Sequence, residues 1–394
     1  MPYLDLDNAR IRYQIDGAAN APVLLLSNSL GTRLEMWAPQ MPALLHQFRV
    51  LRYDTRGHGE SSVPLGDYSL GELGSDVIGL LDRLRLDRVF FCGLSMGGLI
   101  GIWLGVHHPD RLHALALCNT GAKIGTAETW KARIDAVHAG GMRQVAPAVI
   151  ERWFTARYRR LRPESVAQLH AMLASTAPAG YAANCAAIRD VDLGDRLTEI
   201  RVPSLVIAGT HDAATPPESG RLIAERVPDA KYVELDAAHL SNWEQSGAFT
   251  AALLTFLTRG EVSEAARRDA GLLVRRAVLG DAYVDRAQSS VTDLNRDFQD
   301  LITRYAWGEI WNRPGLTRHT RSLVTIAFTV ALNRPDELEL HLRAAVNNGV
   351  SANDIKEVLI HAAVYCGVPA ANAAFHLAAE VLAEAEPTDG AAAT

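Results

Sequence analysis

Cysteine is scarce in this chain, and its few thiols are far apart. The 394 residues contain 4 cysteines, and none has the close spacing of a metal-binding or dithiol motif: Cys92, Cys118, Cys185 and Cys366. Cys92 and Cys118 lie in apolar runs, where a free thiol packs as a small hydrophobic group. Because scattered free thiols are typical of a reducing compartment, we expect a cytoplasmic protein without a metal site.

The chain also lacks an excess of positive charge and any long hydrophobic run. Its 39 Lys and Arg residues are outnumbered by 45 Asp and Glu residues, which gives a net charge of −6. This balance disfavours nucleic acid or an anionic membrane as the main partner, and an anionic substrate would need locally placed arginines. No apolar run approaches membrane-spanning length, and residues 1–10 lack the basic and apolar segments of a signal peptide.

The sequence is long enough for two domains, and the first has an α/β pattern. Its 394 residues exceed the usual size of one hydrophobic core. Short apolar runs alternate with helical patterns, which indicates a mostly parallel sheet whose strands are buried on both faces. The runs occupy residues 21–29, 48–54, 87–95, 112–120, 203–212 and 230–239.

The rest of the sequence predicts helices. Residues 121–195 are rich in Ala, Arg and Trp without a strand pattern, and we interpret them as a helical cap inserted in the first domain. After residue 263 the apolar patterns have helical spacing. The predicted order is an α/β domain over 1–260, a short linker over 261–266, an all-α domain over 267–385 and a disordered tail over 386–394.

The first domain carries a motif for a serine nucleophile. The pentapeptide GLSMG at 93–97 lies between an apolar run and a helical pattern, the context of the G-x-S-x-G nucleophile elbow. A serine hydroxyl needs a base to take its proton and an acid to orient that base. Asp212 and His239 each follow a predicted strand, in the chain order typical of α/β-hydrolases. We therefore predict Ser95, Asp212 and His239 as a catalytic triad, with His211 as the nearest rival base.

Two backbone N–H groups are predicted to form the oxyanion hole that a tetrahedral intermediate requires. One belongs to Met96, directly after the nucleophile, and the other to Leu30, in the loop after the first long apolar run. Asn28 and Ser29 stand where many α/β-hydrolases have His-Gly. We interpret the Gly-rich loop at 54–61 as a structural part of the pocket wall.

The first domain resembles 3-oxoadipate enol-lactonases over nearly all of residues 1–258, in the strings SNSLGTRLEMWAPQ, RYDTRGHGES, GLSMGG, TAETWKARI and AAHLSNWEQ. The resemblance implies hydrolysis of an enol-lactone that carries a free carboxylate. Trp130 and Arg133 share one helix face in the cap, so Arg133 is our candidate for binding that carboxylate beside Trp130. A solvated arginine beside a core tryptophan is the alternative, and the fold alone leaves a general esterase or haloperoxidase-like hydrolase open.

The second domain resembles 4-carboxymuconolactone decarboxylases over nearly all of residues 265–385, in the strings YAWGEIWNRPGLTRHTRSLVTIAF and DELELHLRAAVNNGVSANDIKEVLIHAAVYCGVPAANAAF. The broader family includes alkylhydroperoxidase-type proteins with a C-x-x-C-x-x-x-H site. Placing His341 on that histidine leaves Arg334 and Glu337 where the two thiols would be. Because a dithiol is missing, we do not expect a peroxidase–reductase role.

The remaining groups of the second domain fit acid–base chemistry. Loss of CO2 from carboxymuconolactone leaves an enolate conjugated with the ring carbonyl, so no cofactor is required. Glu337 and His341 share a helix face, and we predict His341 as proton donor or enolate stabiliser with Glu337 orienting it. An exposed charged helix face is the alternative. The candidate substrate-binding residues are Arg313, Arg318 and Arg334, with His319 and Arg321 in the same cluster and Glu309 and Cys366 as weaker candidates.

The two resemblances imply consecutive reactions. Decarboxylation of 4-carboxymuconolactone yields 3-oxoadipate enol-lactone, and hydrolysis of that lactone yields 3-oxoadipate. We therefore expect a bifunctional enzyme of protocatechuate catabolism that acts on small lactone carboxylates. A homo-oligomer through the C-terminal helical domain is also expected. The alternative is a hydrolase whose helical domain serves only in oligomerisation.

Overall fold

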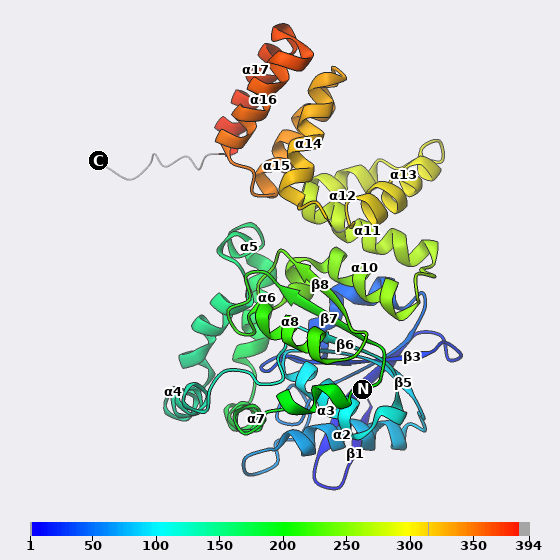
Figure 1. Cartoon of the computed structure of the whole chain (residues 1–394), viewed down its shortest axis with the longest axis vertical. Coiled ribbons are helices and arrows are strands. Elements are labelled where there is room, and N and C mark those ends of the chain that lie inside the picture. The colour runs from blue at the N-terminus through cyan, green and yellow to red at the C-terminus, as the bar shows by residue number, and fades with distance from the viewer. Residues whose placement is uncertain (1, 314, 386–394) are drawn as a thin grey trace. The chain divides into compact units, whose positions relative to one another are not determined.

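The computed structural model describes residues 2–313 and 315–385, which form two compact units. The first unit is Met1–Ala270 and the second is Gly271–Thr394 (Figure 1). The division falls within α11 (Glu264–Leu279), whose first turn includes residues 264–266 of the predicted linker. The predicted tail at 386–394 lies outside the described residues. The predicted fold class, α/β followed by all-α, is confirmed.

The first unit is built on an eight-stranded sheet in the order β1-β2-β4-β3-β5-β6-β7-β8. Neighbouring strands from β4 to β8 pair in parallel, whereas β1 with β2 and β2 with β4 pair antiparallel. The strands are β1 (Tyr3–Asp5), β2 (Arg10–Asp16), β3 (Val23–Ser27), β4 (Arg49–Tyr53), β5 (Val89–Leu94), β6 (Leu112–Cys118), β7 (Ser204–Gly209) and β8 (Lys231–Leu235). The strands β3 to β8 correspond to the six predicted runs, and β1 and β2 were not predicted.

Helices connect the parallel strands and pack on the sheet. The helix α3 (Met96–His107) packs against β5 and β6, and α8 (Pro217–Arg226) packs against β7 and β8. The other helices outside the cap are η1 (Leu34–Gln40), α1 (Met41–Leu44), α2 (Leu70–Arg83), η2 (Pro109–Arg111), η3 (Gly194–Glu199), α9 (Ser241–Glu244) and α10 (Ser246–Leu257). Their apolar faces and the buried strands share one hydrophobic core.

The cap is an excursion of the chain between β6 and β7. It consists of α4 (Ala127–Trp153), α5 (Ala156–Leu161), α6 (Pro163–Ala174) and α7 (Pro178–Arg189). At Gly141 the backbone leaves the helical region, with φ 65° and ψ −165°, so α4 is two helical segments joined by a kink. Glycine adopts this positive φ without the steric cost that a Cβ would add. The segments of α4 pack against α6 and α7, which makes the cap a small helical layer of its own.

The regular elements among the described residues of the second unit are all helices. After α11 it contains α12 (Asp281–Ser289), α13 (Arg296–Ile302), the π-helix η4 (Thr303–Ile310), α14 (Arg318–Ala331), α15 (Pro335–Asn347), α16 (Ala352–Cys366) and α17 (Val368–Ala385). The turn before α16 combines Gly349, at φ 79°, with a capping box between Ser351 and Asp354. A Cβ on Gly271 would lie 2.3 Å from the carbonyl oxygen of Thr303, so α11 can pack this closely on η4 only through glycine.

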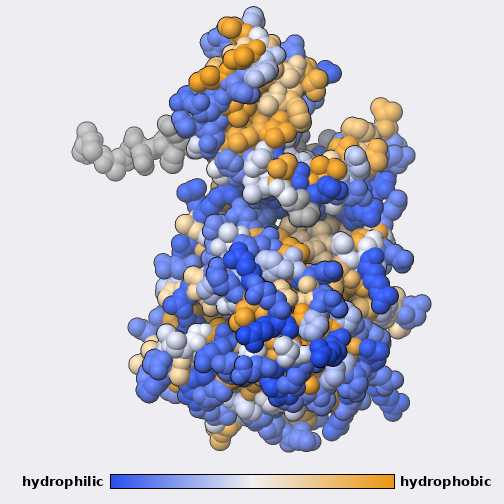
Figure 2. All heavy atoms as spheres, in the orientation of Figure 1, coloured by the Kyte–Doolittle hydropathy of each residue, from blue (hydrophilic) through white to orange (hydrophobic). Residues whose placement is uncertain are grey.

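Exposed hydrophobic side chains are concentrated in the second unit. Figure 2 shows them gathered over the helices at the top of the view. Val324 and Phe328 lie four residues apart on one face of α14, and Ile360 and Val364 lie four residues apart on one face of α16. Leu332, at the C-cap of α14, and Val368, at the start of α17, are exposed as well. Such exposed apolar faces are typical of interaction surfaces. No described helix is both long and apolar enough to cross a membrane.

Candidate active sites

The serine of the G-x-S-x-G motif lies in a sharp turn between β5 and α3. Ser95 has φ 56° and ψ −113°, a strained conformation for a residue with a side chain. Its N–H donates to the carbonyl of Cys118 over 2.9 Å, and its carbonyl accepts from the Thr120 hydroxyl over 2.8 Å. A Cβ on Gly93 would lie 2.0 Å from the carbonyl oxygen of Gly97, so the turn requires glycine there. The turn holds Ser95 at the carboxyl end of the sheet.

The backbone around the predicted oxyanion hole has free donors. Within residues 2–313 and 315–385, the N–H groups of Leu30 and Met96 have no hydrogen-bond acceptor, although both residues are buried. The loop of Leu30 is fixed by the next residue, because the Gly31 N–H donates to Nε2 of His58 over 2.8 Å. Buried N–H groups without a protein acceptor are rare, and an oxyanion would satisfy them.

Asn28 links this loop to the serine turn. Its carbonyl accepts from the Gly97 N–H over 3.0 Å, and its side chain joins Trp37 and Tyr53 through bonds of 2.9 and 2.7 Å. Asn28 thus stabilises both sides of the predicted oxyanion hole. The sequence identified the position as unusual but did not predict this role.

The predicted acid and base are hydrogen-bonded to each other. Nδ1 of His239 lies 2.8 Å from Oδ2 of Asp212, and both side chains are buried. Burial alone would raise the pKa of Asp212, but His239 and the hydrogen bonds to the carboxylate outweigh it and lower that pKa. An ionised Asp212 holds the proton of His239 on Nδ1, which leaves Nε2 able to accept one. His211 instead pairs with Asp236 at 2.8 Å, and both are exposed.

Asn119 also contacts Asp212, and the sequence did not identify it. Its Nδ2 donates to Oδ2 of Asp212 over 3.0 Å and to the carbonyl of Ala238 over 3.3 Å. Thr215 adds a hydroxyl bond of 2.7 Å to the same oxygen. The one available signal was the position of Asn119 directly after the run that forms β6.

Ser95, Asn119, Asp212 and His239 follow β5, β6, β7 and β8 in turn. These four strands are adjacent and parallel, so the residues that follow them stand at one edge of the sheet. The carboxyl end of a parallel sheet is where α/β proteins commonly bind ligands. Ser95 and the hydrogen-bonded pair of Asp212 and His239 therefore stand at the same edge, and their action as a catalytic triad stays a prediction.

Arg133, the predicted carboxylate-binding residue, lies on α4 in the cap. The guanidinium carbon of Arg133 lies 4.9 Å from the ring centroid of Trp130, which is buried. Burial raises the pKa of Tyr181, while the charge and hydrogen bond of Arg133 and the charge of Arg152 oppose this shift, so both guanidiniums lie near that hydroxyl. Within the described residues Arg133 has no carboxylate partner. It therefore has capacity to bind an anion.

In the second unit the predicted residues fall into separate groups. His341 is partly buried, and burial lowers its pKa although the charge of Glu337 opposes this shift. Glu337 is exposed, and within the described part of the unit its side chain acts on His341 through charge without a hydrogen bond. Arg334 lies exposed at the start of α15.

A second group surrounds the end of η4. Arg321 donates to the carbonyl of Arg313 over 2.9 Å, and burial followed by the charge of Arg313 lowers the pKa of Arg321. Trp307 and Trp311 stack with ring centroids 5.2 Å apart. Of the other predicted residues, His319 lies 3.3 Å from Asp354, while Arg318, Glu309 and Cys366 are partly buried. Among residues 271–313 and 315–385, no hydrogen bond or ion pair joins this group to His341, so a common site stays a prediction.

Two family descriptions match the chain. Residues 22–246 match the alpha/beta hydrolase fold, and residues 296–380 match the carboxymuconolactone decarboxylase family. The first region is 41% identical over 256 residues to 3-oxoadipate enol-lactonase 2 of Acinetobacter baylyi, covering 65% of this chain and 96% of the relative. The second is 57% identical over 111 residues to 4-carboxymuconolactone decarboxylase of the same organism, covering 28% of this chain and 83% of the relative.

The chain belongs to the α/β-hydrolase family through its first unit and to the carboxymuconolactone decarboxylase family through its second. A solved enol-lactonase from Burkholderia xenovorans LB400 supports the first assignment. It is 49% identical with a TM-score of 0.65, covering 65% of this chain and 100% of the solved chain. The predicted fusion of two enzyme families is confirmed.

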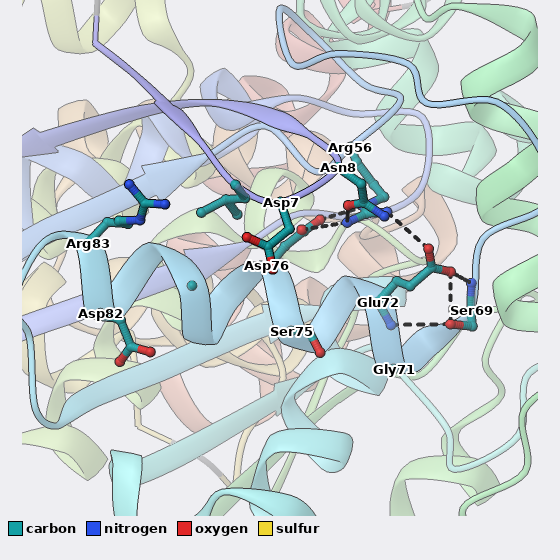
Figure 3. Close-up of a pocket in the computed structure, with 12 residues that line it drawn as sticks. Asp7, Asn8, Arg56, Ser69, Gly71, Glu72, Ser75, Asp76, Asp82 and Arg83 are labelled. Carbon is teal, nitrogen blue, oxygen red and sulfur yellow. Dashed lines mark hydrogen bonds and ion pairs between the residues drawn. The ribbon is translucent and has the colours of Figure 1, made fainter.

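The hydrolase unit has another pocket, beside α2 and the loop after β1 (Figure 3). Arg56 forms two bonds of 2.6 Å with Asp76 and one of 3.3 Å with Glu72. Asp7 and Asp82 add two further carboxylates to the lining, whereas Arg83 adds only one further guanidinium. Because Arg56 is already paired with carboxylates and acidic side chains predominate in the lining, this pocket is unsuited to an anionic lactone.

Proposed function

We propose that the chain is a bifunctional enzyme of protocatechuate catabolism. In this proposal the second unit decarboxylates 4-carboxymuconolactone to 3-oxoadipate enol-lactone, and the hydrolase unit hydrolyses that lactone to 3-oxoadipate. The observation that carries it is the 2.8 Å bond between His239 and Asp212, set at the same sheet edge as Ser95, in a chain that also contains a decarboxylase-family unit. The curated relatives of the two units bear the names of these consecutive reactions.

Lactone hydrolysis in this proposal begins at Ser95. Its Oγ attacks the ring carbonyl while Nε2 of His239 accepts the hydroxyl proton, and the N–H groups of Leu30 and Met96 bind the developing oxyanion. The ring C–O bond then breaks, and the departing enol oxygen takes the proton from His239. Water, deprotonated by His239, attacks the acyl carbonyl, the ester bond to Ser95 breaks, and Oγ takes the proton back from His239. The enol released by ring opening tautomerises to the ketone of 3-oxoadipate. Arg133, stacked on Trp130, binds the free carboxylate of the lactone.

Decarboxylation is assigned to His341. Its lowered pKa favours the neutral imidazole, whose N–H can donate to the enolate oxygen that forms as CO2 departs. Glu337 acts on His341 through its charge. Arg313, Arg318 and Arg334 are proposed to bind the substrate's carboxylates, and the required proton reaches the ring carbon after CO2 has left.

We also propose a homo-oligomer that forms in the cytoplasm. The apolar faces of α14 and α16 provide the contact surface, since Phe328 is 62% and Val364 is 77% exposed. The four cysteines are free, and Cys92 and Cys118 remain unbridged with sulfurs 3.8 Å apart, which supports a reducing compartment.

The test supplies the purified chain with 4-carboxymuconolactone and follows CO2 and 3-oxoadipate together. Ser95→Ala should release CO2 and accumulate the enol-lactone, whereas His341→Ala should lose CO2 release but still hydrolyse added enol-lactone. If neither variant separates the two products, the two-site proposal is wrong. A wild-type preference for p-nitrophenyl acetate over enol-lactone would favour a general esterase, and CO2 release unaffected by His341→Ala would remove that residue from the mechanism.

A further inference from the structure

Glu244, at the end of α9, bonds to both the histidine loop and the cap. Its Oε2 accepts from the backbone N–H of Ala238 over 3.0 Å and from that of Thr155 over 3.3 Å. Its Oε1 accepts from the Thr155 hydroxyl. Ala238 directly precedes His239, and Thr155 is the N-cap of α5 in the cap. One carboxylate thus joins two segments that lie more than eighty residues apart in the chain.

Backbone contacts beside Glu244 join the same two segments. The His239 N–H donates to the carbonyl of Arg152 over 3.4 Å, and the Leu240 N–H donates to that of Trp153 over 3.0 Å. The last turn of α4 therefore runs along the histidine loop, and Glu244 closes the junction where α4 ends. The same helix carries Arg133 on the other side of its kink at Gly141.

A carboxylate is a costly group to place at this junction. Burial raises the pKa of Glu244, the charge of Asp236 adds to this shift, and the bonds from Thr155 and Ala238 oppose it. Arg157 is the nearby positive charge, and burial lowers its pKa while Glu244 raises it. Removing the carboxylate would leave the N–H groups of Ala238 and Thr155 without their acceptor. The contacts are thus specific to an acceptor at this position and are not reproduced by an apolar side chain.

We propose that Glu244 is a positioning residue that holds the His239 loop against the end of the cap. The position of the His239 imidazole then depends on how the cap packs against this loop. Glu244 touches neither substrate nor the reacting atoms, and it acts through His239. The inference rests on the proposed serine-hydrolase function of the first unit. It does not depend on which lactone or ester is the substrate.

The experiment compares Glu244→Ala, Glu244→Gln and the control Glu151→Gln in the full chain. Glu151 is an exposed carboxylate near the end of α4. Three readouts are used: kcat and KM for the enol-lactone, the same constants for p-nitrophenyl acetate, and the rate at which a small fluorophosphonate inactivates Ser95. The last two readouts report on the serine and its base regardless of the natural substrate.

We expect Glu244→Ala to lower kcat for both substrates and the inactivation rate by about 10- to 100-fold, with KM within about threefold of wild type. Glu244→Gln should recover most of the rate, because its amide oxygen can accept both N–H groups and its NH2 can face the Thr155 hydroxyl. Glu151→Gln should match wild type. If Glu244→Ala does not fold, Thr155→Val removes one donor and should lower kcat severalfold.

Several outcomes would overturn the proposal. A Glu244→Ala protein with unchanged kcat and inactivation rate would exclude the positioning role, as would an equal loss in the Ala and Gln variants. For the fallback variant, an unchanged kcat in Thr155→Val has the same meaning. A wild-type chain that reacts with the phosphonate but does not hydrolyse the enol-lactone would contradict the proposed substrate. The role of Glu244 would then still be tested by the inactivation rate and by p-nitrophenyl acetate hydrolysis.

Discussion

Nδ2 of Asn119 donates to Oδ2 of Asp212 over 3.0 Å from a left-handed backbone with φ 43°. Asparagine is among the few residues other than glycine that adopt this conformation readily. Its backbone and its amide therefore serve different purposes at the end of β6. The backbone turns the chain away from the sheet, and the amide helps to fix the acid that orients His239.

Replacing Asn119 should separate these two purposes. We expect Asn119→Gly to keep the backbone and lower kcat for lactone hydrolysis by roughly 10- to 100-fold, because a hydrogen bond to a charged group is lost. Asn119→Ala should show the same kinetic loss and an additional destabilisation of about 1 kcal/mol from the left-handed backbone. Steady-state kinetics and urea unfolding measure the two effects. A fully active Asn119→Gly protein would show that Thr215 and His239 suffice to hold Asp212.

The stability of the first unit should fall as the solution becomes acidic, because of His58. Burial lowers the pKa of His58 from 6.5 to about 4. Since the unfolded state binds a proton first, stability is lost as pH falls from the unfolded pKa towards the folded one, by up to about 3 kcal/mol. Urea unfolding at pH 7.5, 6 and 5 measures the slope.

His58→Gln is the matched variant for this pH effect. Glutamine keeps an uncharged acceptor for the Gly31 N–H, which adjoins the predicted oxyanion donor of Leu30. The variant should therefore lose most of the acid sensitivity between pH 7.5 and 5. An unchanged slope would assign the sensitivity to other buried groups.

Two glycines should respond in opposite directions to the same substitution. A Cβ on Gly97 would lie 2.2 Å from the carbonyl oxygen of Ser27, which is backbone and cannot rotate away. We expect Gly97→Ala to destabilise the first unit by about 2–4 kcal/mol and to abolish hydrolysis. Gly71, in α2, has no atom closer than 3.9 Å to that position, so Gly71→Ala should stabilise by roughly 0.5–1 kcal/mol. Urea midpoints compare them, and equal shifts would contradict the steric argument.

Removing the cap's cation should affect charged substrates selectively. We expect Arg133→Ala to lower kcat/KM for the enol-lactone by about 10- to 100-fold, because a charge-assisted bond to the carboxylate is lost. Hydrolysis of uncharged p-nitrophenyl acetate should stay within about twofold of wild type. Arg143→Ala, an exposed change on the same helix, serves as control. An enol-lactone kcat/KM within twofold of wild type would exclude Arg133 as the carboxylate-binding residue.

The sequence was most informative where a structure depends on local pattern. Apolar runs located the six strands from β3 to β8, since parallel strands buried on both faces leave continuous hydrophobic segments. The strand β2 escaped because its burial is mixed and its register is set by pairing with β4. The π-helix η4 was also missed, because apolar spacing predicts a helix there without distinguishing a π-helix from an α-helix.

In the site, too, local sequence pattern identified some residues, whereas contacts between distant segments determine the others. Ser95, Asp212 and His239 follow strands at positions that a motif and chain order can identify. Asn119 and Glu244 make their contacts across 93 and 89 residues of sequence, so only the folded chain brings their partners into reach. In the second unit the predicted residues lie in separate groups, because sharing a helix face says nothing about which other helices approach it.

The cap leaves the sheet after β6 and returns at β7, two strands that are neighbours. Its length and composition can therefore change in evolution without altering the strand register beneath it. Ser95, Asp212 and His239 lie at the ends of sheet strands, whereas Arg133 lies in the inserted segment. If Arg133 binds the substrate as proposed, a different cap would change the substrate preference, provided that its end still meets the histidine loop at Glu244.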